Sequence, residues 1–65
     1  MEVEWEETRD LIENMVPPQR LIGRNIDILA GAVIVERLYA KLTERPFDRK
    51  EAVWKVLNTG RWDGQ

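Results

Sequence analysis

The inward positions of the first segment recur at the spacing of an amphipathic helix. At 100° per residue they fall within a sector of roughly 140°, and most of the acidic residues lie on the opposite side. These positions are Trp5, Thr8, Leu11, Ile12, Met15 and Val16. The pair Pro17-Pro18 follows at once, and a proline keeps the residue before it out of the helical region. The pattern predicts a helix over about residues 3–15 that ends at this pair.

Residues 28–35 read Ile-Leu-Ala-Gly-Ala-Val-Ile-Val and contain no polar side chain. Residues 33–35 are β-branched, which favours a strand. The apolar pattern nevertheless continues to Leu42 at a spacing of three to four residues, with charged residues in the gaps, and this period is helical. Asn25 and Asp27 are both good N-cap residues, so the helix is expected to begin near one of them. We therefore predict a central helix over about residues 25–43.

The predicted central helix has two apolar faces. One face extends along the whole helix, and we expect it to pack on the chain's own other helices. It comprises Ile28, Val35, Leu38, Tyr39 and Leu42. The other face is confined to the first half and comprises Ile26, Leu29, Ala30 and Val33. Small residues in the middle of the helix allow a second helix to approach closely, so we predict that this shorter face is the self-association surface.

A third helix is predicted over about residues 49–58. Asp48 and Glu51 have the spacing of a capping box, and Phe47 stands where a hydrophobic staple begins. The inward positions of this helix are Ala52, Val53, Val56 and Leu57. The chain is thus predicted to be a single all-α, three-helix domain over residues 1–65. In the tail that follows, Trp62 either packs back on the core or, if exposed, anchors a protein partner.

The length of the chain limits how much apolar surface it can bury alone. A chain of 65 residues buries only about 60% of the surface that its unfolded form exposes. It has no cysteine and therefore no disulfide to compensate. We expect a homo-oligomer that buries the central helix, with a dimer favoured and a tetramer still open.

Composition also bears on location. Four glutamates stand within the first seven residues, where an export signal has basic and then apolar residues. The uncharged run is shorter than the ~20 residues that a bilayer crossing requires. The absence of cysteine fits a reducing compartment. We expect a cytoplasmic protein with no membrane partner.

The chain lacks the side chains most used in catalysis. It contains no His, Cys or Ser, so the usual nucleophiles and the best proton-transfer group at neutral pH are missing. The acidic cluster lies on a face expected to be exposed, where nothing raises a carboxyl pKa. No calcium-loop motif is present, and the scattered glycines form no phosphate-binding loop. We therefore predict no enzyme, no cofactor and no metal site.

Charge is distributed unevenly. Residues 1–16 carry six acids and one base, whereas residues 17–65 carry nine bases and six acids. Residues 40–60, with a helix end, a short turn and a capped second helix, resemble the second half of a ribbon-helix-helix repressor or antitoxin. In that family a short strand before the two helices pairs across a dimer and reads the major groove. The resemblance implies such a dimer here, with the strand at residues 19–24; from the residues alone, this segment remains open to helix, turn or strand.

The ribbon-helix-helix interpretation implies a basic patch on the dimer that contacts nucleic acid. Its residues would be Arg20, Arg24, Arg49, Lys50 and Lys55. Two features depart from the family pattern, because an acidic helix precedes the strand position and the net charge of -2 is unfavourable for phosphate contacts. DNA-binding regulation is therefore the alternative. The leading hypothesis is a small non-enzymatic helical protein, of the kind that phages and mobile elements encode. It would self-associate and bind a protein partner as regulator, adaptor or inhibitor.

Overall fold

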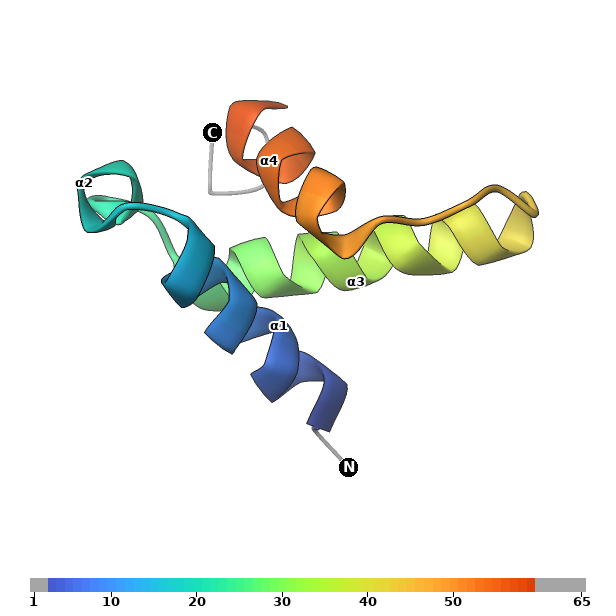
Figure 1. Ribbon diagram of the computed structural model, residues 1–65, viewed down its shortest axis with the longest axis horizontal. Coiled ribbons are helices and arrows are strands. Elements are labelled where there is room, and N and C mark those ends of the chain that lie inside the picture. Colours follow the sequence, from blue (N-terminus) through green and yellow to red (C-terminus); the bar gives the residue numbers. More distant parts are fainter. Residues whose placement is uncertain (1–2, 60–65) are drawn as a thin grey trace.

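The computed structural model describes residues 3–59, and over these residues the chain is helical without a strand (Figure 1). The helices are α1 (Val3–Met15), α2 (Pro18–Leu21), α3 (Ile26–Leu42) and α4 (Arg49–Thr59). The prediction of an all-helical chain built on three main helices is confirmed. The predicted boundaries agree with the structure to within a residue, and α2 is an additional short turn.

Helix α1 ends at the proline pair, as predicted. Its last helical hydrogen bond runs from the Val16 amide to the Ile12 carbonyl at 3.0 Å. Both of these side chains are buried in the core, and so is Thr8, whose hydroxyl donates to the Glu4 carbonyl at 2.8 Å. Among the described residues Thr8 is the one buried polar side chain, and its hydrogen bond is made within its own helix.

The segment before α3 is a helical turn followed by a tight bend. Pro18 occupies the first turn of α2, where a proline needs no hydrogen-bond partner. Gly23 has φ +78°, a backbone conformation that favours glycine. Residues 18–21 are thus helical and residues 22–25 turn the chain. The strand that the ribbon-helix-helix interpretation requires at residues 19–24 is not found.

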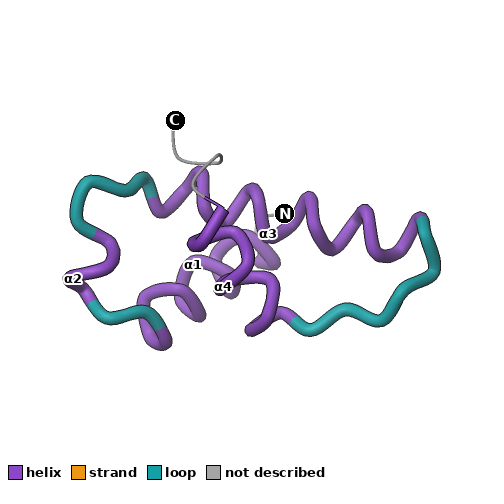
Figure 2. Tube along the Cα trace, turned by 90° about the horizontal axis from the view of Figure 1, so that it is seen from above, coloured by secondary structure: helices purple, strands orange, loops and turns teal. Residues whose placement is uncertain are grey.

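Helix α3 is the central element. The Asn25 side chain accepts hydrogen bonds from the amides of Asp27 and Ile28 at 2.9 and 3.3 Å, so of the two predicted candidates Asn25 is the N-cap and Asp27 lies inside the helix. Its 17 residues make it about 26 Å long. Helices α1 and α4 both pack against α3, and its last turns extend beyond them to a loop that leads back to α4 (Figures 1 and 2).

The core lies where α1 and α4 meet the first half of α3. Leu29, Ala30 and Val33 are at most 2% exposed and belong to this core, and Ile26 is partly buried against it. The inward residues predicted for α4 are buried as well. The expectation that the short face of α3 lacks a partner inside the monomer is therefore wrong. This face is covered by the chain's own helices.

The small residues of α3 serve this internal packing. A Cβ added at Gly31 would stand 3.0 Å from the Trp5 ring, which shows that the indole of α1 lies directly against the glycine backbone. Close approach was predicted at this position for a second copy of the chain. In the structure α1 uses it instead, because an indole needs the space that a missing side chain leaves.

Helix α4 begins at the predicted cap. The Asp48 carboxylate accepts a hydrogen bond from the Lys50 amide at 2.9 Å, and Phe47 packs against the core. Trp54 lies at the margin of the core, as expected. Trp62, the predicted partner anchor, lies outside the described residues.

Candidate interaction surface

The largest group of exposed apolar side chains lies along α3. These five residues are Ile28, Val35, Leu38, Tyr39 and Leu42, and we call them the α3 strip. Each is between 41% and 82% exposed. They occupy one sector about 100° wide and follow the helix for about 21 Å. The prediction that this face packs inside the monomer is wrong, because α1 and α4 cover the other sides of α3.

The strip is bounded by polar contacts that hold α1 and α4 in place. On the α1 side, Arg9 Nε lies 3.1 Å from Asp27 Oδ1 in an ion pair that is not aligned as a hydrogen bond. Arg37 pairs with Glu4 further along α3. These four side chains are all at least 41% exposed, so each pair contributes only about 0–1 kcal/mol to stability. Their effect is to fix where α1 lies beside the strip.

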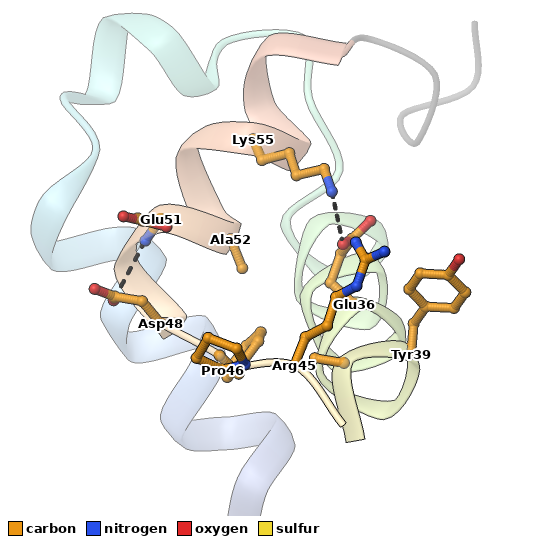
Figure 3. A pocket seen from close by; sticks show the side chains of 10 residues that line it. Glu36, Tyr39, Arg45, Pro46, Asp48, Glu51, Ala52 and Lys55 are labelled. Carbon is orange, nitrogen blue, oxygen red and sulfur yellow. Dashed lines mark hydrogen bonds and ion pairs between the residues drawn. The ribbon is translucent and has the colours of Figure 1, made fainter. Parts of the chain in front are cut away.

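On the α4 side, Lys55 Nζ lies 3.1 Å from Glu36 Oε1. This pair crosses the mouth of a cleft between the last turns of α3, the loop after it and the first turns of α4 (Figure 3). The cleft has a volume of about 280 Å³, and Tyr39 links it to the strip. Its charged lining carries both signs: Glu36, Arg45, Asp48, Glu51 and Lys55.

The cleft has no constellation that indicates a specific ligand. Its apolar lining consists of small or partly buried groups, including Ala40, Phe47 and Ala52. Within residues 3–59 no cluster of three or more carboxylates or other metal-binding side chains is found. Two of its charged residues, Glu36 and Lys55, already pair with each other, which leaves the strip as the stronger candidate for an interaction surface.

The structure does not gather the predicted nucleic-acid contacts into one patch. Arg20 donates to Asn58 Oδ1 at 3.2 Å and its guanidinium stands 5.9 Å from the Trp54 ring centroid. Arg24 donates to the Leu57 carbonyl at 3.0 Å. Both arginines therefore lie at the carboxyl end of α4, where positive charge is favourable.

The other three basic residues lie elsewhere on α4. Arg49 and Lys50 occupy its first turn, about 12 Å along the axis from the contacts of Arg20 and Arg24. Lys55 is paired with Glu36. In the monomer the predicted basic patch is thus divided between the two ends of α4.

No helix among the described residues is both long and apolar enough to cross a membrane. A comparison with protein-family models, curated proteins and solved structures found no significant match. Only the chain's own surfaces therefore bear on its function.

Proposed function

We propose that this chain is a small non-enzymatic helical protein that self-associates and binds a protein partner as a regulator, adaptor or inhibitor. One observation carries the self-association. Five large apolar side chains share one exposed face of α3, and none of them is less than 41% exposed. Contiguous apolar surface of this kind marks interaction sites in soluble domains. The proposed contact is the α3 strip. The face that was predicted from the sequence for self-association is covered within the monomer.

The strip has enough apolar surface for a weak dimer. Burying a fully exposed large apolar side chain contributes about 1.5–3 kcal/mol, and the strip residues begin about half exposed. Two copies together gain roughly 10 kcal/mol, against an association cost of about 4–15 kcal/mol. At the low end of that cost the surplus is about 6 kcal/mol, which corresponds to a dimer with a dissociation constant of tens of micromolar that exchanges with monomer.

The partner of the assembled protein would meet the surfaces that the dimer leaves free. The most strongly charged of these is the outer face of α1, where Glu7 and Asp10 are exposed. A protein with a basic surface fits this face by charge complementarity. Binding that weakens with salt and is lost in a Glu7→Lys, Asp10→Lys variant of unchanged helicity supports this assignment, and binding insensitive to the substitutions contradicts it.

Light scattering tests the self-association directly. At about 100 µM the wild-type chain is expected to have an average mass well above that of the monomer, because this concentration exceeds a dissociation constant of tens of micromolar. Leu38→Glu is expected to return it to monomer. Ile22→Glu is the matched control, since Ile22 is 80% exposed but lies outside the strip. A wild-type chain that is strictly monomeric at this concentration contradicts the proposal.

The same preparation tests the DNA-binding alternative. Retention on a DNA column that falls steeply with salt and is lost when exposed Lys50 is replaced by alanine indicates phosphate contacts. That result would move the function to the nucleic-acid class. Absence of retention at low salt agrees with the protein-binding proposal.

A further inference from the structure

We infer that the two copies of this chain pair through their α3 strips with the two α3 helices antiparallel. This inference rests on the proposed self-association and adds its geometry. Ile28, Val35 and Leu42 repeat at intervals of seven residues, and Leu38 continues the seam between the last two. A seven-residue apolar repeat is the pattern by which two helices pack along their length.

The shape of the monomer favours the antiparallel arrangement. In the first half of α3, the Arg9–Asp27 pair holds α1 along one flank of the strip, and the Trp5 ring covers Gly31 within the sector of the strip. The last turns extend beyond α1 and α4 (Figures 1 and 2). When the helices run in opposite directions, the extending half of each copy lies over the first half of the other. Both uncovered ends are then buried in the same interface.

The charges beside the strip favour the same direction. Asp27 and Lys41 lie on one flank of the strip, two seven-residue intervals apart, and both are exposed. On α1, Glu6 and Glu13 stand one turn before and after Arg9, so the side of α1 that faces Asp27 is acidic. In an antiparallel pair, Lys41 of each copy lies near Asp27, Glu6 and Glu13 of the other copy. By symmetry the dimer has two such contacts.

A parallel pair would have the opposite electrostatics. The extending halves of both copies would lie side by side, so the two Lys41 side chains would share one end of the seam. Like charges at one end of a seam oppose association. The two helix dipoles would also be aligned in a parallel pair and opposed in an antiparallel one. Charge therefore selects direction, while the apolar strip supplies affinity.

Engineered cysteines determine the direction, because the natural chain has none. In an antiparallel register that places Ile28 opposite Leu38 of the other copy, Asp27 lies about two residues, or roughly 3 Å, along the axis from Lys41 of that copy. Ile28→Cys and Leu38→Cys chains carry tags of different lengths, so that their cross-linked products differ in size. The two variants are mixed and oxidised under mild conditions. The expected main product is the disulfide-linked dimer of one Ile28→Cys chain and one Leu38→Cys chain. Its yield should be several-fold higher than that of a dimer of two identical variants. Leu42→Cys alone is expected not to cross-link, since in this register its two copies lie about 27 Å apart.

The controls separate the two proposals. Ile22→Cys reports random collision, since Ile22 is exposed outside the strip. Efficient like-with-like cross-linking of Leu42→Cys means a parallel pair, which overturns the direction and leaves self-association standing. No cross-link above the Ile22→Cys level in any mixture, with a monomeric mass, overturns both.

A charge exchange provides an independent measurement. Lys41→Glu is expected to weaken the dimer about three- to tenfold at low salt, because it reverses two exposed ion contacts per dimer. Adding Glu13→Lys is expected to restore most of the loss. A Lys50→Glu variant, with the same charge change on α4 away from the strip, should leave the dissociation constant within twofold. Failure of Glu13→Lys to restore binding contradicts the antiparallel arrangement.

Discussion

The two halves of α3 are almost equally apolar, but the structure treats them differently. The first half buries Leu29, Ala30 and Val33 between α1 and α4. The second half leaves Leu38, Tyr39 and Leu42 more than half exposed. Two causes combine: α1 and α4 pack on the face of α3 that carries these three core residues, and with 13 and 11 residues they leave the last turns of the 17-residue α3 uncovered. A helix longer than its neighbours retains apolar surface that another molecule can cover.

The largest effect is expected from a charge placed in the covered half. Val33 is 2% exposed in the centre of the core, and Val33→Asp would bury a carboxylate without a partner. We expect this variant to be unfolded, since such a substitution costs more than the roughly 5 kcal/mol that marginally stable small domains have. Circular dichroism at low temperature measures this. A cooperative unfolding transition close to that of the wild type would contradict the assignment of the core.

Filling the space beside Trp5 should have the next largest effect. At Gly31 even a Cβ stands 3.0 Å from the indole, so Gly31→Leu must displace the ring. We expect a loss of about 1–3 kcal/mol in unfolding free energy, typical of overpacking. Urea denaturation and the shift in tryptophan emission report it together. Unchanged emission and stability would mean that the indole does not pack on α3 in this way.

A smaller effect is expected at the start of α3. The Asn25 side chain accepts hydrogen bonds from two amides, and Asn25→Ala should cost about 0.5–2 kcal/mol of stability. Asn25→Asp is the matched control, because it retains the accepting oxygen and suits the helix dipole. Equal stability of the alanine and aspartate variants in urea would show that the cap contributes nothing.

The smallest effect on stability is expected in the uncovered half. Leu42 is 82% exposed, so Leu42→Glu should leave the unfolding free energy of the dilute monomer within about 0.5 kcal/mol. Measured at several protein concentrations, the wild type should gain stability with concentration more than the variant does, because association stabilises the folded state. A large loss of stability in the dilute monomer would mean that Leu42 packs inside the chain.

Most of the fold could be predicted from the sequence, since its signals are local. The proline pair ends α1, Asn25 caps α3 and Asp48 caps α4, and each of these acts within one turn of chain. The all-helical architecture follows from these stops and from the apolar periodicity between them.

The orientation of α3 could not be predicted in the same way. Helical periodicity identifies two apolar faces but does not determine which one the neighbouring helices cover. The confinement of Ile26, Leu29, Ala30 and Val33 to the first half was interpreted as a surface for a second copy. The same confinement is expected when two shorter helices, α1 and α4, cover only the first half of α3. This is the arrangement that the structure has. Gly31 was a further signal, because its missing side chain admits Trp5 of α1.

The basic residues were separated by tertiary structure that local patterns do not contain. Arg20 and Arg24 lie near the middle of the sequence but bind Asn58 and the Leu57 carbonyl at the end of α4. These contacts depend on α2 folding back over more than thirty residues of chain. A strand-like alternation of arginines was visible at residues 19–24, and it arises here in a helical turn and a bend.

The most direct test of the central claim is to map, residue by residue, which face of α3 responds to association. Amide NMR spectra of the wild-type chain are recorded while it is diluted from about 500 to about 20 µM, a range chosen for micromolar affinity. The account predicts progressive shifts along the α3 strip, at Ile28, Val35, Leu38, Tyr39 and Leu42, with Ile22 and Val53 unchanged. Spectra that do not change on dilution, or shifts centred on residues outside the α3 strip, would contradict it.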